Sequence, residues 1–224
     1  MLSFVGESHF DVDAHTRLRT LLNRLKPDII SVEDVETRYE YDRPIHGALV
    51  TLVREEWDCI AQHNPSLNHD TFMRWFENLH AVPEAIEAYR NTWEVPIIFA
   101  DDEDSTDRWI TQGTPNPYLL NPELEQFLSL PLEKARAQIA QEYAQESYPV
   151  ADSPELVTFY RERDEHAERI LRAVIHENPG VHVVHVAGLD RVYGDHHNLY
   201  DRLSDLAPKR CKLSDADIGC GPGH

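Results

Sequence analysis

The chain has 224 residues, of which 41% are hydrophobic, and its 40 acidic and 21 basic residues give a formal net charge of -19 at pH 7. Such a charge repels nucleic-acid phosphates and anionic lipid heads, so we expect neither nucleic acid nor a membrane as a partner. No apolar run reaches the roughly 18 residues of a membrane-spanning helix, and the N-terminus lacks the features of a signal peptide. Because the three cysteines have no CxxC spacing, we expect a cytoplasmic protein without a disulfide framework or a zinc knuckle.

The first predicted elements form a strand–helix–strand unit. Residues 2–5 form a short apolar strand that ends at Gly6, and leucines at helical spacing follow until Pro27. A second strand is predicted over residues 28–33. A strand, a helix and a strand within about thirty residues are typical of a βαβ unit, in which the two strands lie parallel.

The rest of the chain continues the alternation of helices and strands. Residues 45–92 have helical apolar spacing and form an insertion before a third strand over 95–100, and a fourth strand is predicted over 181–187. The pattern predicts an α/β fold with a mostly parallel central sheet flanked by helices. We assign residues 1–210 to a single domain and 211–224 to an edge strand and a flexible tail.

Polar residues follow each predicted strand, and the carboxyl ends of parallel strands form the edge of a sheet that binds ligands. Carboxylates and imidazole bind divalent metals, and a bound metal turns water into a nucleophile. Glu33 follows an apolar strand, so its burial requires a partner, for which Arg38 is the nearest candidate. Helix caps and solvated turns also place carboxylates at strand ends, and this alternative stays open. The residues concerned are Glu7, His9, Glu33, Arg38, Asp101 to Asp104, Asp190 and Arg191.

Four short motifs occur in a defined order along the chain. They are Gly6-Glu7-Ser8-His9, Glu33 with Arg38, the segment PEAIEAYRNTWEVPIIFAD, and Arg163-Asp164 before the segment VHVVHVAGLDRVYG. In this order the motifs resemble the TraB/PrgY (pheromone-shutdown) family. Its wider clan includes Tiki-type proteases, ChaN-like haem-binding proteins and erythromycin esterases. The resemblance spans about residues 2–205.

The chain departs from this family in the second GxxH motif, which reads Gly188-Leu189-Asp190-Arg191. Arginine has no usable lone pair at neutral pH, so Arg191 cannot act as the metal ligand that the family's histidine would be. Asp190, or His196 and His197 from the next turn, would take over this role. Otherwise the metal site is absent.

The resemblance implies a metal-dependent hydrolase of peptide, amide or ester bonds, with a small molecule or a peptide as substrate. A divalent metal, Mn, Zn or Co, would be held by His9, Glu33 and Asp190. Glu7 or Glu33 would act as the general base. Two arginines would orient carboxylates or stabilise an oxyanion. The residues expected to act in catalysis are therefore Glu7, Glu33, Arg38 and Arg163.

The alternative is a non-catalytic protein that binds a small molecule, a peptide or haem on the same fold. Arg191 would then pair with an anionic group of the ligand, and His196 would also contact it. The missing histidine favours this alternative, whereas the retained Gly6-Glu7-Ser8-His9 motif and Glu33 favour the hydrolase. The sequence leaves the oligomeric state open, with a homodimer as one alternative.

Overall fold

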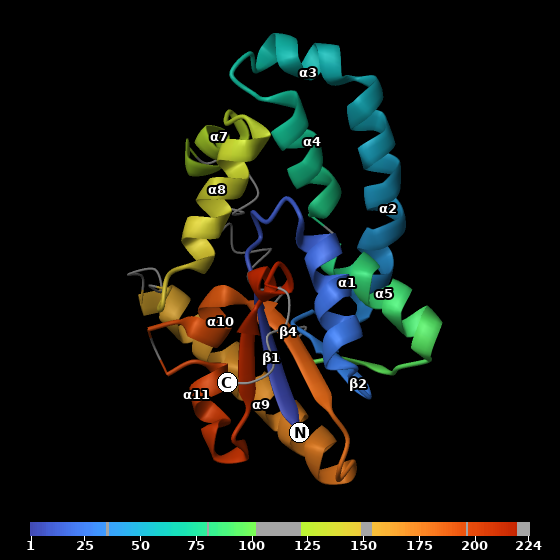
Figure 1. Cartoon of the computed structure of the whole chain (residues 1–224), viewed down its shortest axis with the longest axis vertical. Helices are drawn as coiled ribbons and strands as arrows, with labels where there is room; N and C mark the ends of the chain where they lie inside the picture. The colour runs from blue at the N-terminus through green and yellow to red at the C-terminus, as the bar shows by residue number, and fades with distance from the viewer. Residues whose placement is uncertain (35, 80, 102–121, 149–153, 196, 219–224) are drawn as a thin grey trace.

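A five-stranded, all-parallel sheet forms the centre of the molecule (Figure 1). The computed structural model describes residues 1–34, 36–79, 81–101, 122–148, 154–195 and 197–218. The strand order is β3-β2-β4-β1-β5, which confirms the predicted α/β fold with a parallel sheet. The strands are β1 (Leu2–Glu7), β2 (Ile29–Val32), β3 (Ile97–Phe99), β4 (Val183–Gly188) and β5 (Lys209–Lys212).

Helices cover both faces of the sheet and extend beyond its carboxyl edge (Figure 1). The helical insertion between β2 and β3 begins at Glu36 and not at residue 45, because the charged and tyrosine residues before 45 lack the apolar spacing on which the prediction depends. The helices before β3 are α1 (Ala14–Leu25), α2 (Glu36–Glu55), α3 (Trp57–His63), α4 (His69–Asn78) and α5 (Ala81–Trp93). Those after it are α7 (Pro122–Leu128), α8 (Leu132–Tyr143), α9 (Pro154–Glu177), α10 (Leu189–Tyr193) and α11 (Leu199–Arg202), with short 3₁₀ turns at Ser204–Leu206 and Leu213–Ala216.

The hydrophobic core has two layers, one on each face of the sheet. Strands alternate their side chains between the two faces, so Val184 of β4 packs toward α1 and α5, whereas Val183 packs toward α9 and α11. Leu18 of α1 fills the first layer and Leu171 of α9 fills the second. Both faces are therefore buried, which explains the nearly continuous apolar runs of these strands.

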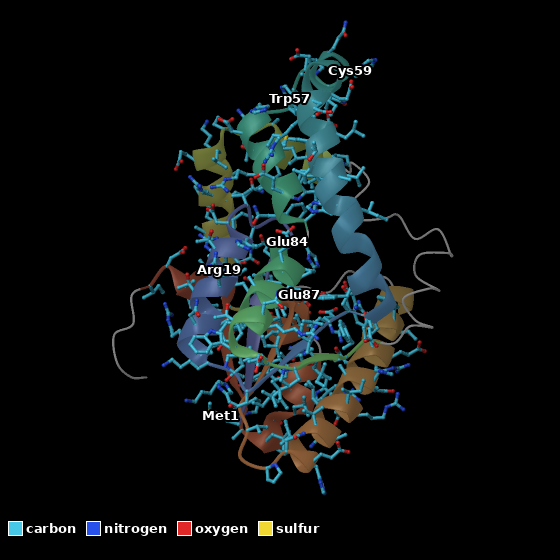
Figure 2. All side chains as sticks on the ribbon, turned by 90° about the vertical axis from the view of Figure 1, so that its right-hand side faces the viewer. Met1, Arg19, Trp57, Cys59, Glu84 and Glu87 are labelled. Atoms are coloured by element: carbon cyan, nitrogen blue, oxygen red, sulfur yellow. The ribbon has the colours of Figure 1, made fainter. Side chains whose placement is uncertain are left out.

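The chain leaves neighbouring strands toward opposite faces at the carboxyl edge. After β1 and β2 it continues into α1 and α2, and α1 packs on the first face, whereas after β4 it continues through α10 and α11, which pack mainly on the second. Ligand sites of open α/β sheets form where connections diverge in this way. Helices α2, α3, α4, α7 and α8 stand beyond the same edge (Figure 1), and Trp57 and Cys59 lie at the end of the molecule opposite Met1 (Figure 2).

The last strand belongs to the sheet. Strand β5 pairs in parallel with β1, from Ser3 opposite Lys209 to Gly6 opposite Lys212. The predicted boundary at residue 210 therefore falls inside a strand, while residues 219–224, predicted as a tail, lie outside the described residues. In the part of the chain that the structure describes, no helix combines the length and the apolar character needed to cross a bilayer.

Candidate active site

A contact between the Glu7 carboxylate and the His9 imidazole lies at the carboxyl end of β1. Nδ1 of His9 is 2.8 Å from Oε1 of Glu7, and the His9 side chain is 60% exposed whereas that of Glu7 is 11% exposed. When the Glu7 carboxylate accepts the Nδ1 proton, Nε2 carries the free lone pair of the neutral imidazole. A β-carbon on Gly6, just before this turn, would lie 3.0 Å from Cδ2 of Leu189 in α10, so that side chain would have to shift by a few tenths of an ångström.

The backbone of Gly188, at the end of β4, brings His9 and Asp190 together. A β-carbon on Gly188 would lie 2.6 Å from Oδ1 of Asp190 and 3.9 Å from Nε2 of His9. Burial raises the pKa of Asp190 and the Glu33 carboxylate raises it further, while Arg191, His9 and Tyr160 oppose the shift. A raised pKa favours the protonated carboxyl group, which can donate a proton.

Both carboxylate oxygens of Glu33 are engaged at the end of β2. Oε1 lies 2.6 Å from Nη1 of Arg191 and 3.0 Å from Nη2 of Arg163, and Oε2 accepts the backbone N–H of Gly188 at 3.0 Å. Burial alone would raise the pKa of Glu33, but Arg191 and then Arg163 outweigh it and lower that pKa to about 2. Glu33 is therefore a permanent anion at neutral pH and a poor general base.

The two arginines continue this network to the neighbouring elements. Arg163 of α9 donates from Nε to Oδ1 of Asp101, which follows β3, at 2.7 Å. Arg191 donates from Nε to Asp164 of α9, and the exposed fractions of these two side chains are 1% and 0%. Burial of so many charges is tolerated because each one has a partner of opposite sign.

The predicted metal ligands do not form a set that fits a metal ion. Glu33 would have to release two guanidinium groups and a backbone amide before it could bind a cation, and Arg191 places a positive charge beside it. His9 and Asp190 alone are two ligands, fewer than the three protein ligands of a catalytic zinc site. No group of three or more histidine, cysteine, aspartate or glutamate side chains within the described ranges is arranged to hold a metal.

Several other predicted residues have definite positions. Arg163, predicted to act in catalysis, reaches Glu33 from α9, whereas Arg191, predicted to pair with a ligand, is buried in the ion-pair network. The side chain of Arg38 and the whole of His196 lie outside the described residues. The predicted partner of Glu33 was Arg38, whereas its partners among the described side chains are Arg191 and Arg163.

Two residues that the sequence analysis did not single out also face the site. Glu142 of α8 accepts a hydrogen bond from Oγ of Ser8 at 2.8 Å, and burial raises its pKa. Tyr160 of α9 bonds to Asp190 and lies one helical turn before Arg163 and Asp164. This i, i+3, i+4 spacing was the one available signal for Tyr160, while nothing near Glu142 in the sequence indicates its contact with Ser8.

Comparisons of this chain with protein-family models, with curated proteins and with solved structures return no match, so the resemblance to the TraB/PrgY family stays a prediction.

Proposed function

We propose that this chain is a hydrolase of peptide, amide or ester bonds, in which His9 is the general base and Glu7 is its positioning residue. The observation that carries the proposal is the 2.8 Å contact between Glu7 and Nδ1 of His9, with Nε2 of His9 near the Gly188 backbone and Asp190. A carboxylate that holds one imidazole nitrogen orients the other toward a substrate or a water molecule.

In the proposed reaction, Nε2 of His9 removes a proton from a water molecule as the water oxygen attacks the carbonyl carbon. The tetrahedral intermediate then collapses, and the leaving nitrogen or oxygen receives a proton from Asp190 or from the His9 imidazolium. The raised pKa of Asp190 supports the role of proton donor. Glu33, Arg163 and Arg191 act as positioning residues, because their ion pairs hold the ends of β2 and β4 together.

The same observations weaken the alternative of an anion-binding protein anchored by Arg191. Its guanidinium is already paired with Glu33 and Asp164, and its side chain is 1% exposed. The metal expected from the sequence is not used in this reaction, since Glu33 would have to leave its arginine partners to bind one. The proposed reaction therefore predicts hydrolysis without a bound metal.

The experiment is a hydrolysis screen of the purified chain against nitrophenyl esters, aminoacyl nitroanilides and short peptides, comparing the wild type with His9→Ala. We expect His9→Ala to lower kcat/KM by roughly 10²-fold or more, as loss of a general base does. His69→Ala is the matched control, because His69 is also exposed (53%) and lies 3.0 Å from a carboxylate, that of Asp70. Unchanged activity in His9→Ala, or no hydrolysis of any substrate class, would contradict the proposal.

A further inference from the structure

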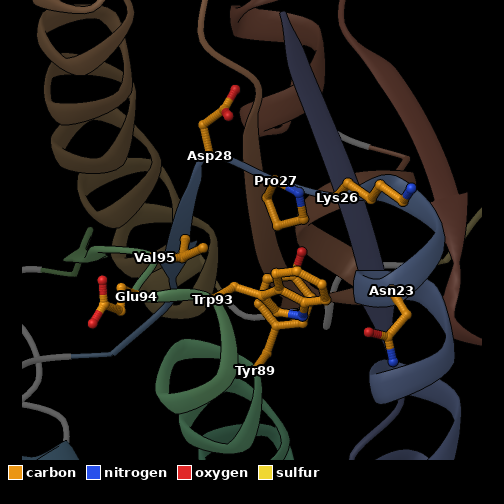
Figure 3. Close-up of a pocket in the computed structure, with 8 residues that line it drawn as sticks. All are labelled: Asn23, Lys26, Pro27, Asp28, Tyr89, Trp93, Glu94 and Val95. Atoms are coloured by element: carbon orange, nitrogen blue, oxygen red, sulfur yellow. The ribbon is translucent and has the colours of Figure 1, made fainter.

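A pocket lies at the amino edge of the sheet, opposite the candidate active site. It is a cavity of about 350 Å³ formed by the end of α1, the loop into β2, the end of α5 and the loop into β3 (Figure 3). Its volume falls at the lower end of the range of roughly 300–1,000 Å³ that is usual for small-molecule sites. The lining residues are Asn23, Lys26, Pro27, Asp28, Tyr89, Trp93, Glu94 and Val95.

The pocket combines an apolar base with an aromatic wall. Pro27, Val95 and Tyr89 are buried, whereas Trp93 is 61% exposed. The rings of Tyr89 and Trp93 lie 6.3 Å apart between centroids, at 40° to each other, and project together into the pocket (Figure 3). Leaving a tryptophan this exposed is unfavourable in water, so an apolar or cationic ligand on its face would gain contact area and cation–π attraction.

Charge around the pocket favours a cation. Two carboxylates, Asp28 and Glu94, lie on its rim against one ammonium group, that of Lys26, within a chain of net charge -19. The Glu94 side chain makes no hydrogen bond or ion pair with any described residue, and one oxygen of Asp28 accepts the backbone N–H of His182 at 2.7 Å. These carboxylates therefore remain available to a ligand, and the field of the whole chain concentrates cations near them.

The Tyr89 hydroxyl in the pocket has no partner among the described residues. Tyr89 is 7% exposed, and its hydroxyl makes no hydrogen bond to any residue that the structure describes. Burial raises the pKa of Tyr89, and Asp28 raises it further, so the ring stays neutral. The hydroxyl therefore keeps its capacity to donate and accept a hydrogen bond, which a ligand hydroxyl in the pocket can use.

We propose that this pocket binds a small organic ammonium ion with an apolar surface, such as a quaternary ammonium that carries a hydroxyl group. The alkyl groups would lie on Trp93 and Tyr89, the positive charge would face Asp28 and Glu94, and the ligand hydroxyl would reach the hydroxyl of Tyr89. Aromatic walls combined with carboxylates are the means by which proteins recognise such cations.

The test uses choline as the probe and 3,3-dimethyl-1-butanol, its uncharged carbon analogue, as the matched ligand. Both are titrated into the wild-type chain and followed by calorimetry and by the indole N–H signal of Trp93. That signal is assigned from its loss in Trp93→Ala. We expect choline to bind at least about tenfold more tightly than the neutral analogue, with an affinity that falls as salt is added.

Three variants test the proposed contacts. Trp93→Ala and Asp28→Asn should each weaken choline binding by roughly tenfold. Lys26→Asn should strengthen it, because the change removes the one cation on the rim and asparagine tolerates the left-handed backbone at this position, where φ is 49°. Trp57→Ala, at the far end of the molecule, should have no effect (Figure 2).

Two results would overturn the proposal. One is equal affinity for choline and the neutral analogue, which would show that the pocket binds apolar groups and does not recognise the positive charge. The other is absence of binding, or of any shift of the Trp93 signal, up to about 10 mM choline, beyond the range of weak but specific small-molecule binding. Neither result depends on hydrolytic activity, so this test and that of the hydrolase fail independently.

Discussion

Nη1 of Arg191 donates a hydrogen bond to Oε1 of Glu33 over 2.6 Å, and 158 positions of the sequence separate these two residues. In the family that the sequence resembles, a histidine is expected at the position of Arg191. In this chain, the arginine instead neutralises Glu33 and Asp164 and connects the ends of β2 and β4 with α9. Arg191, which cannot act as a metal ligand, therefore holds a charge network together.

Replacement of Arg191 by methionine should destabilise the fold strongly. Arg191→Met leaves the buried carboxylates of Glu33 and Asp164 without their main partner, and we expect a loss of about 3–5 kcal/mol in the free energy of unfolding. Urea denaturation followed by circular dichroism measures it. The matched control is Arg172→Met. The Arg172 side chain is 38% exposed, so its replacement should lower the free energy of unfolding by about 1 kcal/mol or less. Similar losses in both variants would show that burial of the network contributes little.

Stability should fall in mild acid because of His185. Burial lowers the pKa of His185 to about 4 from its ordinary value of 6.5. Between these pKa values the unfolded chain binds a proton at His185 that the folded chain does not. The contribution of His185 to the free energy of unfolding is therefore complete above pH 6.5 and is lost as the pH falls toward 4. The loss should amount to roughly 3 kcal/mol.

The non-titrating variant His185→Asn isolates this effect. Asparagine can keep the contact with Oγ of Ser31, which lies 3.0 Å from Nδ1 of His185, but it binds no proton. The stability difference between wild type and variant should shrink as the pH falls. A difference that stays constant from about pH 7 to about pH 4 would contradict the prediction. Because the pKa of Glu33 is lowered to about 2, the wild type and His185→Asn should both lose further stability as the pH falls below 4.5.

Gly188→Ala should impair the site with little effect on folding. The new β-carbon would lie 2.6 Å from Oδ1 of Asp190 and 3.9 Å from Nε2 of His9, and it must displace the Asp190 carboxyl group. We expect kcat/KM for any substrate found in the hydrolysis screen to fall by about tenfold or more. Gly47→Ala is the control: it meets no atom within 4 Å on α2 and should stabilise the chain by about 0.5–1 kcal/mol. Equal activity in both variants would argue against a role for Asp190.

Metal titration tests the metal site predicted at His9, Glu33 and Asp190. In the structure these residues do not form a ligand set that fits a metal ion. We expect hydrolysis to survive treatment with a chelator, and calorimetry with manganese, zinc and cobalt to show no binding at micromolar concentration. The reason is the engagement of both Glu33 oxygens by arginines and a backbone amide. A stoichiometric metal that is lost on chelation together with activity, and is absent from His9→Ala, would restore the metal-dependent hydrolase.

The elements that the sequence predicts well are those whose signal is local. Strands β1, β2, β3 and β4 are buried on both faces or nearly so, and each lies within one or two residues of its predicted apolar run. The start of α2 at Glu36 was missed because its first residues carry no apolar face. The convergence of strand ends on one edge was predictable, because it follows from a parallel sheet alone.

The partners of the site residues were not predictable, because they depend on contacts between distant segments. Glu33 was matched with Arg38, the nearest arginine along the chain, whereas the described network uses arginines from α9 and α10. Glu142 reaches Ser8 across 134 positions of the sequence. The amino-edge pocket is formed by the ends of α1 and α5, and no pattern in either helix indicates that they meet there.

The position of β1 has a consequence for how the protein is made. Strand β1 is made before the other four strands of the sheet and lies between β4 and β5, so Ser3 bonds to His182, 179 positions later, and Phe4 to Cys211, 207 positions later. At roughly 5–20 residues per second, the apolar β1 waits on the order of 10–40 s for its neighbours. During that time its unpaired edges and apolar faces are open to aggregation, and chaperones that bind short apolar strands have a natural target in Leu2–Glu7.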